Sequence, residues 1–179
     1  MSVRLLLAIA ATSISLLGGA GAQQPAATPP ANPLDVVPEK MPFNTPYGAP
    51  IDAQTAQSVI QAAAADATKR GWQLNIAVVD SGGNLVSFLR MDGAQLASIS
   101  ISEHKARAAV KYRRPTRFFE DAIQTKDIKY ILTLDDVITS RGGIPLVQDG
   151  KIVGAVGCSG GTGSQDEVIC AAGAALINK

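Results

Sequence analysis

The stretch "GGIPLVQDGKIVGAVGCSG", residues 142–160, carries the clearest fold signal in the chain. Two apolar runs flank Asp149-Gly150, and this dipeptide is the commonest signal for a two-residue β-hairpin turn. A glycine-rich loop and an alanine-rich run follow, and they predict a helix over 165–177. Ser164 and Glu167 have the spacing of a capping box at the start of that helix. This part of the chain therefore predicts an antiparallel hairpin followed by a helix.

The residues before it predict the same kinds of element. Asp52 is a good N-cap for a helix that Gly71 is placed to end. A second hairpin is predicted over 72–91, and helices are predicted over 98–111 and 116–124. Because hairpins pair their strands antiparallel, the order of elements predicts an α+β fold, a mostly antiparallel sheet with helices packed on it.

The N-terminal part of the chain differs in composition from the rest. A basic residue, Arg4, precedes an apolar run that ends at Leu17, and small residues follow. This pattern predicts a secretory signal peptide at 1–22, because the apolar run is too short to span a bilayer. Eight of the ten prolines lie in 23–50, which predicts an extended arm or linker before one domain at 51–179. We expect a periplasmic or secreted protein that does not insert in the membrane after cleavage.

Composition narrows the classes of partner. The formal net charge is +1 and aromatic residues make up 4% of the chain, so neither a basic surface nor a stacking platform indicates nucleic-acid binding. The glycine loop lacks a phosphate-binding lysine, since no Lys or Arg lies between Lys151 and Lys179. We interpret the loop as a strand-to-helix turn. Cys158 and Cys170 are either a disulfide formed after export or two small buried side chains, and the sequence leaves both open.

Three cationic side chains are the candidates for ligand binding. His104 is the only histidine, so it has no partners for a zinc site, but a single imidazole is enough for an axial ligand of haem iron. The alternative is a solvent-facing helix residue. Arg90 and Lys105 are candidates to receive carboxylates, such as haem propionates or a small organic acid. Arg90 and Asp92 have the alternative of a structural ion pair.

Several separated motifs then point to a family. They are "IAVVDSGGNLVSFLRMDGA", "HKARAA", "GGIPLVQDGKIVGAVGCSGG" and "QDEVICAAGAAL". In their order and spacing, over about residues 51–179, these motifs resemble the GlcG/HbpS family, which includes the C-terminal domain of PduO-type proteins. The resemblance implies a profilin-like α/β/α sandwich with a five-stranded antiparallel sheet, homo-oligomers and haem binding. Some members are described as haem-degrading or as accessories of a membrane sensor kinase.

The resemblance also extends to single residues that match the family's motifs, and most of them are typical of turns, caps and packing. The matching residues are Asp80, Gly83, Arg90, Asp92, Lys105, Gly142, Gly143, Pro145, Gly157, Ser159, Gly160, Gln165 and Asp166. Ala108 stands where the family commonly has threonine in its K-A-x-T-A motif. His104 lies one helical turn before Ala108, so it is placed to take over a haem-holding role on the same helix face.

Three functional hypotheses follow. The first is an exported haem-binding protein in which His104 ligates the metal and Arg90 and Lys105 hold the propionates. The second is a module that binds a small organic acid without haem, in a pocket whose further residues are Asp92, Gly142, Gly143, Ser159 and Gly160. The third is an enzyme acting on a small hydroxy or carbonyl compound, with no catalytic residue assigned; haem degradation rests on the resemblance alone.

Overall fold

The computed structural model describes residues 34 and 36–178, and one compact unit extends over Glu39–Lys179. The predicted signal peptide, residues 1–22, lies outside the described residues. The helices and strands of the compact unit are α1 (Ala53–Arg70), β1 (Asn75–Asp80), β2 (Leu85–Arg90), α2 (Ser98–Lys111), α3 (Arg117–Gln124), the 3-10 helix η2 (Lys129–Thr133), β3 (Gly143–Gln148), β4 (Lys151–Ser159) and α4 (Gly163–Ala174).

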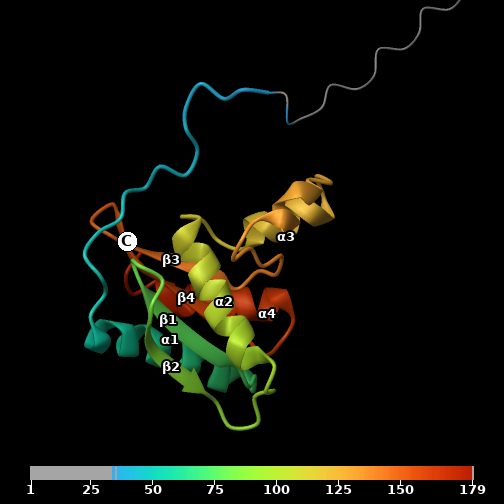
Figure 1. Ribbon diagram of the computed structural model, residues 1–179. Helices are drawn as coiled ribbons and strands as arrows, with labels where there is room; N and C mark the ends of the chain where they lie inside the picture. Colours follow the sequence, from blue (N-terminus) through green and yellow to red (C-terminus); the bar gives the residue numbers. More distant parts are fainter. Residues whose placement is uncertain (1–33, 35, 179) are drawn as a thin grey trace, which may run out of the picture. The chain divides into compact units, whose positions relative to one another are not determined.

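The strands form one antiparallel sheet in the order β2-β1-β4-β3 (Figure 1). Each of the two predicted hairpins supplies two neighbouring strands, and β1 and β4 join them at the centre of the sheet. Helix α2 packs on one face, and α1 and α4 pack on the other. The larger apolar core lies between the sheet and α1 with α4, and a smaller one lies under α2. The predicted mixed α+β fold with an antiparallel sheet is confirmed.

Local signals place the element boundaries where the sequence predicted them. The Asp52 carboxylate accepts a hydrogen bond from the Thr55 backbone N–H, and Gly71 ends α1 with a φ of 68°. Asp149 and Gly150 both have positive φ, 51° and 72°, which a type I′ hairpin turn requires. These predictions succeed because the interactions that fix each boundary lie within a few residues of it.

The start of α4 corrects one prediction. The N-cap is Thr162 and not Ser164: the Thr162 hydroxyl accepts from the Gln165 backbone N–H, and the Gln165 side chain accepts from the Thr162 backbone N–H. Thr162 has the extended backbone that an N-cap needs, whereas Ser164 is already helical. Helix α4 therefore begins at Gly163 and ends at Ala174, and the predicted range 165–177 was shifted towards the C-terminus.

The number of strands is also corrected, because the described residues form a four-stranded sheet where five strands were expected. Residues 46–51 run beside the start of β4 but make one isolated parallel bridge, Tyr47 with Ile152. Pro46 and Pro50 have no backbone N–H, so this segment cannot form a continuous ladder of hydrogen bonds. The profilin-like description stays a prediction.

A disulfide between Cys158 and Cys170 joins β4 to α4, with the two Cα atoms 5.6 Å apart. Both side chains are fully buried in the larger core. This settles the alternative that the sequence left open. None of the helices in the described part of the chain has the length and hydrophobicity needed to cross a membrane.

Candidate functional site around helix α2

Lys105 projects from α2 into the interior, where its side chain is 1% exposed. Its ammonium donates to Asp166 Oδ2 at 2.7 Å and to the Cys158 carbonyl oxygen at 3.1 Å. Asp166 lies in the first turn of α4, and its other carboxylate oxygen accepts from the Gly161 backbone N–H at 2.9 Å. The positive charge of Lys105 is therefore already neutralised inside the protein, in an ion pair that ties α2 to the glycine loop.

Gly142 and Gly143 lie against this ion pair. A Cβ atom on Gly142 would approach the Lys105 Nζ to 3.2 Å, and one on Gly143 would lie 2.2 Å from the Lys105 carbonyl oxygen. Both glycines are buried, and Gly142 has a φ of 117°, a backbone angle that residues with a side chain rarely adopt. The structure thus brings three of the predicted site residues together as a packed contact between α2 and the start of β3.

A second buried polar cluster lies beneath the start of α2. The Ser159 hydroxyl donates to the Ser98 hydroxyl at 3.1 Å, and the Gln95 amide donates to Ser98 at 2.6 Å. Asn75 Nδ2 donates to the Gln95 carbonyl at 3.1 Å, and its Oδ1 is buried without a partner among the described residues. Ser159 was predicted from sequence, and the structure adds Asn75 as an unused acceptor. Gly160 follows, where a Cβ would lie 2.4 Å from a backbone oxygen of Gln73.

Arg90 and Asp92 lie at the far end of β2 and are exposed. Neither side chain forms a hydrogen bond or an ion pair within the part of the chain that the structure describes. The alternative of a structural Arg90–Asp92 pair is therefore wrong. Arg90 is the backbone partner of Asn75 in the β1–β2 ladder. The two side chains therefore leave the sheet next to each other on the same face.

His104 lies on α2 next to Lys105 but has different surroundings. Its ring is half-buried, and the Nε2 atom is shielded from solvent without a hydrogen-bond partner among the described residues. Ala108, one turn further along the same flank, is fully buried. An imidazole nitrogen whose hydrogen-bonding capacity is unused is the kind of atom that can serve as a ligand.

Two further cations follow His104 on α2, and an acidic residue faces them. Lys111 forms an ion pair with Asp136, and Arg107 lies 3.4 Å from the Glu103 carboxylate. A hydrogen bond from Lys111 holds the pKa of the Asp136 carboxyl below its usual value, against the effect of burial. The nearby charges of His104 and Arg107 lower that pKa further. Asp136 is thus the counter-ion of Lys111, and Glu103 is the counter-ion of Arg107.

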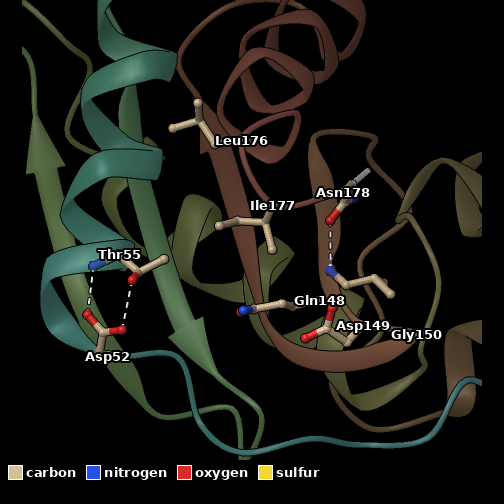
Figure 2. Close-up of a pocket in the computed structure, with 9 residues that line it drawn as sticks. Asp52, Thr55, Gln148, Asp149, Gly150, Leu176, Ile177 and Asn178 are labelled. Atoms are coloured by element: carbon tan, nitrogen blue, oxygen red, sulfur yellow. Dashed lines mark hydrogen bonds between the residues drawn. The ribbon is translucent and has the colours of Figure 1, made fainter.

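The structure also has a groove of about 800 Å³ at the β3–β4 turn (Figure 2). It is bounded by that turn, by the start of α1 and by the chain after α4. There the Asp52 carboxylate accepts hydrogen bonds from the Thr55 backbone N–H and hydroxyl, and the Asn178 side-chain oxygen accepts one from the Val147 backbone N–H. The predicted site residues do not line this groove, since its lining is Asp52, Thr55, Val147, Gln148, Asp149, Gly150, Leu176, Ile177 and Asn178.

Sequence reasoning missed Arg107, Lys111, Asp136 and Asn75. The predicted helix over 98–111 already places His104, Arg107 and Lys111 on adjoining rows, because residues three and four apart are neighbours on a helix. Asp136 carries no local signal, because its contact with α2 spans 25 residues of sequence.

Comparison with known proteins agrees with this architecture. The model of the family described as "Haem degrading protein HbpS-like" matches residues 51–175. The chain belongs to the HbpS-like family. Protein GlcG of Escherichia coli strain K12 is 38% identical over 109 residues, which cover 61% of this chain and 81% of GlcG.

Solved structures of HbpS-like proteins share the fold. A double mutant of HbpS from Streptomyces reticuli matches with a TM-score of 0.68 and 28% identity, over 87% of this chain and 100% of that one. A complex of PduOC with haem matches with a TM-score of 0.65 and 27% identity, over 73% of this chain and 96% of that one. The family and the mixed α+β fold with an antiparallel sheet are therefore established, and a haem complex is known for one relative.

The residues around α2 fit haem in part. His104 Nε2 is the kind of nitrogen that ligates haem iron, and it has no other partner among the described residues. Lys105 is neutralised by Asp166, and Arg90 lies at the β2 edge of the sheet, whereas α2, which carries His104, packs on β4, β1 and β3. The ligand atom is present, but the predicted propionate partners are not gathered around it.

Proposed function

We propose that this HbpS-like chain is an exported haem-binding protein in which His104 supplies the iron ligand. The observation that carries the proposal is the Nε2 atom of His104, the only histidine in the sequence, which is shielded from solvent without a hydrogen-bond partner among the described residues. A buried polar atom without a partner is unfavourable, and its persistence is explained if a ligand uses it. Bound haem would supply a redox-active iron. In this proposal Lys105 has a structural role, since Asp166 already holds its charge.

The test is a haem titration of the purified protein, followed by absorption spectroscopy in both iron oxidation states. We expect a saturable shift of the Soret band that is lost in His104→Ala, because alanine cannot ligate iron. Ser100→Ala, an exposed position on the same helix, is the matched control and should bind as the wild type does. A broad, unsaturable change in the wild type would contradict haem binding, and an unchanged spectrum in His104→Ala would remove His104 from the site.

Export, homo-oligomerisation and a membrane sensor partner complete the proposal. The apolar run before Gln23 supports export, and the Cys158–Cys170 disulfide supports it further, because disulfides persist in oxidising compartments. The relationship to HbpS-like proteins supports the oligomer and the sensor partner.

A second candidate function is the binding of a small hydroxy acid without haem. Arg90 has no ion-pair partner in the described chain, and the buried Asn75 Oδ1 beside it lacks a donor. A carboxylate would pair with the guanidinium, and a hydroxyl would donate to Asn75. Thermal stabilisation by glycolate in a protein that does not titrate with haem would favour this candidate.

A further inference from the structure

We propose that Arg107 and Lys111 bind the carboxylates of the ligand at the His104 flank, and that Asp136 occupies their place in the ligand-free protein. The segment 134–140, which carries Asp136, then acts as a cover that must move before a ligand reaches His104. This inference rests on the proposed haem site, because it names the residues that would receive the haem propionates there.

His104, Arg107 and Lys111 lie along one side of α2. Arg107 and Lys111 follow His104 by three and seven residues, so all three project from one side of α2. Arg107 and Lys111 are both accessible at the surface, with side chains 34% and 47% exposed. A planar ligand that is ligated through His104 would therefore present its acidic edge to two guanidinium or ammonium groups on the same helix.

A carboxylate, that of Asp136, already lies beside Lys111. Lys111 is ion-paired with Asp136, and the Tyr112 hydroxyl donates to the Asp135 carbonyl oxygen at 2.6 Å. These two contacts hold segment 134–140 to the same helix that carries His104. The Arg107 charge also acts on the Asp136 carboxyl, and the Arg107 guanidinium itself lies 3.4 Å from the Glu103 carboxylate.

Polar contacts hold the cover to α2, and Val137 packs partly buried against the small apolar cluster of Phe119, Ala122 and Ile131. Residues 137–139 have no helix or strand, and no residue of 134–140 is fully buried. Polar contacts near the surface are weak individually, because water competes for both partners. A ligand carboxylate of equal charge can therefore replace Asp136 at Lys111.

The experiment compares Asp136→Asn with the wild type in two assays. The first measures how fast diethylpyrocarbonate modifies His104 without any haem, by peptide mass spectrometry, which is unambiguous because His104 is the only histidine. The second is the haem titration. We expect modification to be faster and haem to bind more tightly, each by about two- to fivefold, the size expected from one partly exposed ion pair. Asparagine adopts the left-handed backbone of Asp136 readily, so only the charge changes.

Lys111→Met separates the two parts of the proposal. This variant also breaks the ion pair, so diethylpyrocarbonate should again modify His104 faster, but it removes a carboxylate partner and should weaken haem binding. Asp127→Asn is the matched control: it removes an exposed acid in the loop after α3 that pairs with Lys129 and should change neither assay.

The outcomes distinguish the two proposals. An unchanged modification rate in both Asp136→Asn and Lys111→Met would overturn the cover. Equal haem affinity in Lys111→Met and wild type would overturn the carboxylate-binding role. Failure of the wild type to bind haem would overturn the proposed function, and the modification rates would still show whether Asp136 covers His104.

Discussion

The Lys105–Asp166 pair shows how a candidate ligand residue became part of the scaffold. Both side chains are almost completely buried, and each makes a further hydrogen bond to the backbone, Lys105 to Cys158 and Asp166 to Gly161. A buried ion pair is favourable only when its members are fully satisfied, and here each charge has two partners. The pair therefore fixes the glycine loop against α2, and its role is structural.

Lys105→Met leaves the Asp166 carboxylate buried without its cation. We expect the free energy of unfolding to fall by about 3–5 kcal/mol, the usual loss when one member of a buried pair is removed. Urea denaturation measures this change. The double variant Lys105→Met/Asp166→Leu should recover part of the loss, because no uncompensated charge is left, and a stable single variant would show that the pair is not satisfied as described.

At the scale of elements, α2 lies unusually close to the strands beneath it. A Cβ atom on Gly157 of β4 would be 2.1 Å from the Ser102 carbonyl oxygen, and one on Gly143 would be 2.2 Å from that of Lys105. The helix backbone thus rests directly on glycines of two strands. This close approach is what lets the side chain of Lys105 reach the far end of β4.

Gly157→Ala should push α2 away from the sheet, because the added methyl group overlaps helix backbone that cannot give way. We expect a loss of about 2–3 kcal/mol in the free energy of unfolding, as for an overpacked core. The control is Gly150→Ala at the hairpin turn, where a Cβ meets nothing within 4 Å and only the left-handed backbone is strained, at about 1 kcal/mol. Equal losses in the two variants, measured by denaturant unfolding, would contradict the close packing.

At the scale of the whole molecule, the disulfide joins the central strand β4 to the last helix across the larger core. Its cysteines are 12 residues apart and fully buried, so the bond closes a short loop and is shielded from reductants in the folded state. It can form only where the compartment is oxidising, which connects the stability of the fold to the proposed export.

Removing the disulfide should therefore destabilise the protein without changing its fold. We expect Cys158→Ala/Cys170→Ala to unfold with a free energy about 3 kcal/mol lower, the loop-closure value for a loop of this size. Thermal unfolding of the protein purified under oxidising conditions, with and without reductant, checks the assignment: the reduced wild type should unfold like the double variant. A reductant-insensitive wild type that resembles the variant would mean that the bond is not formed.

The sequence by itself determined the features that depend on neighbouring residues. The Asp52 cap, the Gly71 ending and the Asp149-Gly150 turn are fixed by backbone conformations and hydrogen bonds within a few positions, so their residue types reveal them. The order of two hairpins and four main helices followed, and with it the antiparallel α+β fold.

Only the tertiary structure decided what the charged residues do. Lys105 meets Asp166 across 61 residues of sequence and Lys111 meets Asp136 across 25, and no local pattern encodes either contact. The described sheet has four strands because Pro46 and Pro50 prevent residues 46–51 from pairing as a fifth. The disulfide forms because α4 folds back on β4. Local interactions choose the elements, whereas packing of those elements decides which charge is buried, which is paired and which stays free for a ligand.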